Sequence, residues 1–141
     1  MIKGKPQPKV KVKSISFLKK KAWKLFSEYI RRRHADTGGT ASCVTCSRAY
    51  HWKQLQAGHF IPGRHNSILF DPRGVHPQCY RCNVPMKGNP REYDAWMRRN
   101  YGPKIIKDLE KKDKEFKQWT RPELEEIIKH FKQKVEELTN K

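Results

Sequence analysis

Two Cys-x-x-Cys pairs contain all four cysteines of the sequence, Cys43 with Cys46 and Cys79 with Cys82. Two such knuckles supply four thiolates for one tetrahedral zinc ion. A zinc ion with four thiolate ligands has no open position for water or substrate, so we expect a structural role. A thioredoxin-like redox motif would account for either pair alone but gives no reason for two.

A histidine and an asparagine stand close to these pairs. His59 lies in the segment between the pairs, bracketed by Gly58 and Gly63, and Asn83 directly follows the second pair. A neutral imidazole can take a proton from water near pH 7, and an amide oxygen can help to hold a divalent ion. These are the residue types that a one-metal nuclease needs, because phosphodiester hydrolysis requires an activated water and positive charge on the phosphate. The structural alternatives are a satisfied or surface histidine and an asparagine that caps a helix.

The charge of the chain favours a polyanionic partner. Its 141 residues contain 32 Lys and Arg against 14 Asp and Glu, which gives a net charge of +18. Residues 1–34 supply +11 of this surplus, with twelve Lys and Arg against Glu28 alone. Nucleic acid is the usual partner of such a surface, although ribosomal and membrane-surface proteins share the bias. We expect Arg31, Arg32 and Arg33 to contact phosphate.

The location of the protein is inferred from two absences in the sequence. No apolar signal segment follows Met1, and no run approaches the length of a membrane span. We therefore expect a cytoplasmic protein with no membrane partner. Thiols stay reduced there, so the paired knuckles should bind metal and not form disulfides.

The hydrophobic pattern predicts an α+β domain between a basic arm and a helical tail. Residues 1–16 have the composition of a flexible basic arm, and an apolar face at three- and four-residue steps predicts a helix over 17–34. We predict strands at 55–61, 68–70 and 75–78, and a helix that begins at the second knuckle. The hydrophobic fraction is 35%, so the core must be small and a zinc cross-link would help to stabilise it.

The remaining third of the chain is predicted to be helical. Asn89 and Pro90 have the types of a helix cap and a first helical residue. A further helix is marked by Ile105, Ile106, Leu109 and Phe116, and Thr120 with Glu123 forms a capping box for the last one. We expect three segments, namely 1–16, a nuclease-like domain over 17–102, and a region over 103–141 that packs on the core or pairs with a second subunit as a homodimer.

The order of knuckle, strand with His59, loop, strand, knuckle, Asn83 and helix resembles the ββα-metal (HNH-type) endonucleases with a four-cysteine zinc, such as phage endonuclease VII. Residues 17–102 are similar to the phage NinG/Rap recombination nucleases. The matching pieces are Cys43-Val44-Thr45-Cys46, Ala57-Gly58-His59-Phe60, Val75-His76-Pro77-Gln78-Cys79, Cys82-Asn83, and Gly88-Asn89 with Tyr93 and Tyr101-Gly102.

This resemblance implies a small zinc-bound ββα-metal core flanked by helices. It makes His59 the general base and Asn83 a ligand of a catalytic Mg²⁺ or Mn²⁺. Endonuclease VII-like enzymes have an acidic ligand just before the histidine, where this chain has Gly58. Asn83 would then be the main ligand, or another residue would assist it, with His76 ranked before Asp71 and His65. Asn66 would brace the loop, and the candidate phosphate contacts there are Arg64, Arg73 and Lys87.

The function that the resemblance implies is a metal-dependent endodeoxyribonuclease of a phage, acting in the bacterial host on DNA that includes branched recombination intermediates. The alternative is a non-catalytic zinc-ribbon protein that binds nucleic acid, for which the charge and the zinc would suffice. The pair of His59 and Asn83 separates the two, because a pure binder does not require it. A ribosome- or RNA-associated protein is disfavoured, since the sequence has no aromatic-rich RNA-reading motif.

Overall fold

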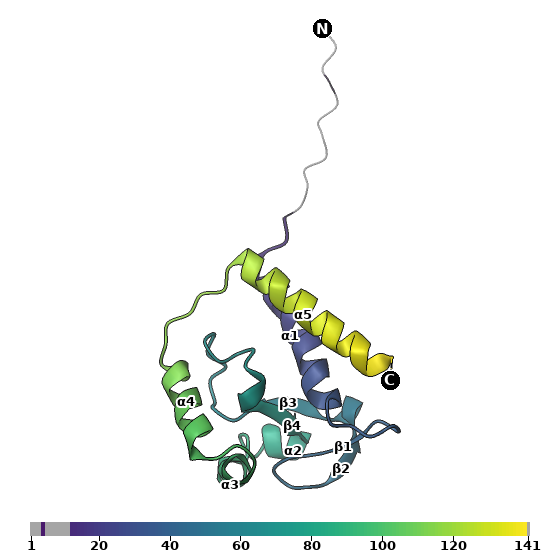
Figure 1. Cartoon of the computed structure of the whole chain (residues 1–141), viewed down its shortest axis with the longest axis vertical. Coiled ribbons are helices and arrows are strands. Elements are labelled where there is room, and N and C mark those ends of the chain that lie inside the picture. The colour runs from purple at the N-terminus through teal and green to yellow at the C-terminus, as the bar shows by residue number, and fades with distance from the viewer. Residues whose placement is uncertain (1–3, 5–11, 141) are drawn as a thin grey trace.

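The structure is a computed structural model that describes residue 4 and residues 12–140 of the chain. Most of the predicted basic arm over 1–16 lies outside these residues. The described part has a mixed α+β fold with two small antiparallel sheets, β1 with β2 and β3 with β4 (Figure 1). The elements in chain order are α1 (Ile15–Arg32), β1 (Thr40–Ser42), β2 (Ala49–His51), β3 (Gln56–His59), β4 (Val75–Gln78), α2 (Tyr80–Asn83), α3 (Pro90–Asn100), α4 (Pro103–Asp113) and α5 (Arg121–Thr139).

The first and last long helices pack side by side and form the main core (Figure 1). α1 begins where the Ser14 side chain accepts a hydrogen bond from the backbone N–H of Phe17. α5 begins with the predicted capping box, in which Thr120 and Glu123 satisfy each other's backbone N–H groups. The buried faces of the two helices meet β3, β4 and the loop between them, and include Leu18, Ala22, Phe26, Ile30, Leu124 and Phe131. The C-terminal helix therefore packs on the core of its own chain.

The two strands nearest the candidate site form an antiparallel ribbon. β3 pairs with β4 so that Gly58 lies opposite His76 and His59 opposite Val75. Successive side chains of a strand point to opposite faces, so His59 and His76 face opposite sides of the ribbon. α2 follows β4 directly, and α3 and α4 complete a second cluster around Tyr93 and Met97.

The predicted strand over 68–70 is wrong. Ile68, Leu69 and Phe70 are all buried, but the backbone here forms successive turns, with Ile68 N–H donating to the carbonyl of His65 and Leu69 N–H to that of Asn66. A strand would alternate between a buried and an exposed face and would need a partner strand. A buried turn and a buried strand both give a short run of consecutive apolar residues, so the sequence pattern could not distinguish the two structures.

Phe116 also departs from its prediction. α4 ends at Asp113, three residues earlier, and the Phe116 side chain is 86% exposed. Its position in the helical stripe of Ile105, Ile106 and Leu109 is coincidental. Among the helices that the structure describes, none combines the length and the apolar character needed to cross a lipid bilayer.

Candidate functional site

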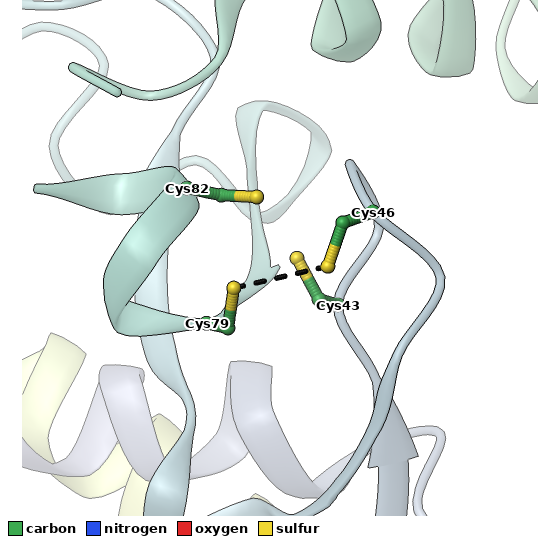
Figure 2. Close-up of side chains that lie close together, drawn as sticks. All are labelled: Cys43, Cys46, Cys79 and Cys82. Carbon is green, nitrogen blue, oxygen red and sulfur yellow. Dashed lines mark hydrogen bonds between the residues drawn. The ribbon is translucent and has the colours of Figure 1, made fainter. Parts of the chain in front are cut away.

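The four cysteines come together at the junction of the two knuckles (Figure 2). Their sulfur atoms all lie within 4.8 Å of one another, and the Sγ atoms of Cys46 and Cys79 are 3.8 Å apart. A tetrahedral zinc ion with Zn–S bonds of about 2.3 Å requires sulfur atoms roughly 3.8 Å apart. The four side chains could therefore hold one zinc ion with little rearrangement.

The local fold explains how these cysteines meet. Cys43 follows β1, and the chain turns back through Ser47, which has a left-handed backbone (φ 65°). Cys79 is the residue before α2, and Cys82 lies on that helix. Burial opposes ionisation of Cys43, but hydrogen bonds from Thr45 and from backbone amides outweigh it and lower its pKa to about 6. One thiol of the cluster is thus poised to ionise, which is the form that binds metal.

His59 stands at the end of β3 with its ring fixed on two sides. Its Nε2 lies 3.2 Å from the carbonyl oxygen of Leu69, and its ring stacks on Trp23 at 5.3 Å between centroids. A carbonyl oxygen only accepts, so Nε2 carries the proton and Nδ1 of the neutral ring has the lone pair. Among the described residues, Nδ1 has no hydrogen-bond partner. The ring is therefore oriented as a proton acceptor through Nδ1.

The charge state of His59 follows from its surroundings. Burial lowers the pKa of its imidazole below the ordinary value of 6.5, against the opposing effect of the Leu69 carbonyl. The nearby Arg64 guanidinium lowers the pKa further by repelling a second positive charge. The neutral, basic form is thus favoured at neutral pH.

Asn83, the last residue of α2, presents its amide to the same region. Its Nδ2 donates a hydrogen bond to Oε1 of Gln56 over 2.6 Å. This bond turns the Asn83 amide, and Oδ1 has no hydrogen-bond partner among the residues that the structure describes. The free oxygen is the kind of ligand that Mg²⁺ and Mn²⁺ accept.

A pocket of about 340 Å³ contains both His59 and Asn83, and its walls also include Trp23, Arg64, Lys87 and Gly88. Two neighbouring hollows share Trp23 and Arg64 with it and extend along α1 past Lys19 and Lys20 in one direction and past Ser27 and Arg31 in the other. Lysine and arginine side chains thus follow one face of α1 on both sides of the pocket. This shape and charge suit an extended anion.

The predicted basic residues divide into two groups. Arg64 and Lys87 line the pocket, and neither side chain forms an ion pair in the described part of the chain; the Arg64 guanidinium lies over the Trp23 ring, 4.2 Å from its centroid. The other four form hydrogen bonds or ion pairs within the protein. Arg31 bonds to Ser27 and lies over Trp52, and Arg32 contacts Glu28 and Thr139. Arg33 donates to the carbonyls of Pro72 and Val75, and Arg73 pairs with Asp71. Arg64 and Lys87 are therefore the better placed to contact an anion in the pocket.

His76 lies away from this pocket, on the other side of the ribbon. It is buried, with Nδ1 and Nε2 each 3.0 Å from a tyrosine hydroxyl, of Tyr93 and Tyr101. The Tyr93 hydroxyl donates to the carbonyl of Gly58, so the network joins the two strands next to His59. Burial and the charge of Arg33 lower the pKa of His76 to about 3. This arrangement is a structural network, and both ring nitrogens are already occupied.

The other predicted assistants of Asn83 are also engaged elsewhere. Asp71 is buried between Arg73 and Lys112, whose charges hold its pKa at about 2 despite burial. His65 contacts Asp113 at 2.6 Å. Asn66 does brace the loop, because its side chain donates to the carbonyl of Lys117 and its own carbonyl accepts from Trp119.

Three contributors to the site were missed in the sequence. Trp23 stacks on His59, Gln56 orients Asn83, and the Leu69 carbonyl fixes the tautomer of His59. Gln56 is three residues before His59 on the same predicted strand and could have been considered as a polar neighbour. No local signal identifies Trp23 or Leu69, because both contacts depend on tertiary packing.

Gly58 has a steric reason to be glycine. A Cβ atom at this position would lie 1.8 Å from Oε1 of Gln78, a fully buried side chain whose Nε2 bonds to Thr45 and to the carbonyl of Gly88. The Gln78 amide thus occupies the space that an acidic side chain at position 58 would need.

We predict that Gly58→Ala lowers the free energy of unfolding by about 1–3 kcal/mol through overpacking. The matched control is Gly38→Ala, where the nearest atom to the new Cβ would be 3.5 Å away. Urea unfolding of both zinc-loaded variants measures the difference. Equal stability of the two variants would contradict the close approach of Gln78.

The sequence is similar to a family of phage proteins. The family model described as the bacteriophage lambda NinG protein matches residues 3–141. Similar proteins include the ninG proteins of Salmonella phage P22 (29% identical over 131 residues), Escherichia phage 933W (29% over 133) and Escherichia phage lambda (28% over 133). These alignments cover 92–94% of this chain and 62–63% of the relatives, so the chain spans less than two thirds of their length.

No solved structure matches the chain significantly. The family model covers nearly all of the sequence, including both cysteine pairs, His59 and Asn83. The chain therefore belongs to the bacteriophage lambda NinG protein family.

Proposed function

We propose that this protein is a metal-dependent endodeoxyribonuclease of the ββα-metal type, with His59 as the general base. The observation that carries the proposal is the orientation of the His59 ring, whose Nε2–H is held by the Leu69 carbonyl while the basic Nδ1 is left for a water molecule. A general base must present such a lone pair to a water molecule at neutral pH.

The residues near His59 fit one divalent ion only with help from a substrate. Asn83 would hold the ion through Oδ1. Among the described residues, the four cysteines are the only group of three or more His, Cys, Asp or Glu side chains that lie close enough together to hold a metal ion. Mg²⁺ keeps several waters and is commonly completed by phosphate oxygens, so a single amide ligand is compatible with it. When bound, the ion would supply positive charge at the strained phosphate.

The protein's own residues would perform three further tasks. His59 would accept the proton of the attacking water at Nδ1, and Trp23 and Leu69 would hold its ring in place. Arg64 and Lys87 would bind the phosphate from the pocket wall, and the cations along α1 would hold the flanking backbone. The zinc cluster would fix α2, and with it Asn83, against β3.

The direct test incubates the purified protein with linear, supercoiled and four-way-junction DNA, with and without Mg²⁺ or Mn²⁺. We expect metal-dependent cutting of at least one form. If no form is cut with either ion while DNA is still bound, the function is that of a zinc-containing nucleic-acid-binding protein. The high net charge supports this second candidate as well as the first.

The pH dependence of cutting gives a second prediction. The general base must be neutral, so the rate should fall as pH decreases through the pKa of His59. Since burial and Arg64 lower that pKa, the midpoint of this acid limb should lie below pH 6.5. Arg64→Gln should move the midpoint upward, towards 6.5, in single-turnover assays. An acid limb centred above pH 6.5 in the unmodified protein would contradict the assignment.

A further inference from the structure

An exposed apolar tip lies directly beside the candidate pocket. It consists of Val84, Pro85 and Met86, which leave α2 at its C-terminal end. The Val84 side chain is 49% exposed and that of Met86 is 39% exposed, and Pro85 is exposed between them. Three consecutive apolar residues in contact with water are unfavourable in isolation, and such a patch commonly marks a binding surface.

The tip is held rigidly by hydrogen bonds to the second cysteine knuckle. The backbone N–H of Met86 donates to the carbonyl of Arg81, and that of Gly88 donates to the carbonyl of Cys82. The Gln78 amide also donates to the Gly88 carbonyl over 2.9 Å. Lys87 and Asn89 have left-handed backbone conformations, with φ of 52° and 48°, that complete the turn. Apolar side chains presented by such a turn lose little conformational freedom on binding.

The position of the tip relates it to a substrate in the pocket. Asn83 precedes the tip, Lys87 and Gly88 follow it, and all three line the pocket that contains His59. Consecutive Cα atoms are about 3.8 Å apart, and consecutive bases of a stacked strand are about 3.4 Å apart. The tip therefore lies within a few nucleotides of a phosphate bound at His59.

The surrounding charges identify the kind of partner. Arg81 and Lys87 are exposed on either side of the tip in the chain, and Lys87 lines the basic pocket. An apolar surface between cations suits a partner with anionic groups outside and apolar faces inside, which describes a nucleic acid strand with accessible bases. An intact duplex hides those faces in its stack. Proteins that bend DNA insert Leu, Ile, Met or Pro side chains between bases in this way.

We propose that the tip of Val84, Pro85 and Met86 inserts against unstacked bases next to the phosphate bound at His59. The tip then selects DNA whose stacking is already broken, such as junctions, bulges and mismatches, because less unstacking energy is needed there. This inference rests on the proposed function for the location of the phosphate. It assigns selectivity for DNA structure to side chains that take no part in cleavage.

The test measures binding and base unstacking without cleavage. The DNA carries 2-aminopurine at a three-base bulge or at a four-way junction. One series of measurements contains EDTA, and a parallel series contains Ca²⁺ instead. Wild-type protein should raise the 2-aminopurine fluorescence and bind these forms more tightly than linear duplex. The affinity ratio is the affinity for the bulged or junction DNA divided by the affinity for linear duplex. The double variant Val84→Ser with Met86→Ser should lower this ratio by about tenfold or more and remove the fluorescence rise.

Two controls keep the result interpretable. Phe116→Ser removes a comparable exposed apolar side chain, 86% exposed and outside the pocket, and should keep the wild-type ratio. The single variant Met86→Gln retains side-chain length and repeats the test should the double variant lose zinc or structure. Zinc content and affinity for linear duplex should stay at wild-type values in each variant used.

The outcomes separate this inference from the proposed function. Unchanged ratio and fluorescence in folded tip variants would overturn the insertion, whether or not the protein cuts DNA, and would leave the tip for a protein partner. A wild-type fluorescence response that the tip variants lose, in a protein that cuts no DNA, would support the insertion and remove the nuclease.

Discussion

Replacing His59 with alanine should lower the rate of DNA cleavage by about 10²–10⁴-fold, the usual contribution of a positioned general base. DNA binding should change little, because it depends on many dispersed cations and His59 is neutral at pH 7. The measurement is single-turnover cleavage beside a binding titration in Ca²⁺. A variant that cuts at the wild-type rate would show that His59 serves only to pack against Trp23.

Two further variants show whether the loss is specific. His130→Ala removes an exposed histidine of α5 and should cleave at the wild-type rate. Asn83→Ala should also suppress cleavage, but through weaker metal binding, so a high Mn²⁺ concentration should restore part of its activity. The His59 variant should not respond to Mn²⁺. Equal recovery of both variants would contradict the separate roles given to the two residues.

Replacing Cys79 with serine should remove the zinc ion and much of the stability in one step. Structural zinc sites contribute about 10–16 kcal/mol of apparent binding free energy, which is comparable to the whole stability of a small domain. The loss should be large because the cluster joins segments 33 residues apart in the chain, the separation of Cys46 and Cys79. Zinc analysis and thermal unfolding measure the two effects together.

Chelation of the unmodified protein should reproduce the behaviour of the Cys79 variant. Ser42→Ala serves as a control, since it alters a neighbouring exposed position on β1 that takes no part in the cluster. A freshly purified protein that contains disulfides and no zinc would remove the zinc site. A protein that loses zinc without loss of stability would show that the two sheets and the helix pair are sufficient alone.

The features that the sequence predicted well are those with a local physical cause. The cysteine spacing, the strands around His59 and Val75, and the capping box of Thr120 and Glu123 depend on neighbours in the chain. α1 and α5 follow from apolar faces repeated at the helical period. The family itself was recognised from the same short motifs, and the family model confirms it at the level of the NinG proteins.

The features that failed or were missed depend on contacts between distant segments. Leu69 and Phe70 of the turn over 68–70 are buried in the core that α1 and α5 help to form, which no pattern within three residues can indicate. The free nitrogen of His59 depends on the Leu69 carbonyl, ten residues away. The occupation of Arg31, Arg33 and Arg73 by protein partners likewise appears only in the folded chain, where their charges were expected to serve phosphate.

The loop that carries Leu69 is attached to the C-terminal part of the chain. The Ser67 hydroxyl donates to the carbonyl of Asp113, Asn66 bonds to Lys117, and Trp119 donates back to Asn66. A growing polypeptide thus acquires the four cysteines and His59 well before the residues that hold the loop against the histidine. During synthesis at about 5–20 residues per second, that interval lasts seconds. The four cysteines of the ribosome-bound chain could take up a metal ion in that time, while the His59 ring still lacks the loop contact that fixes its orientation.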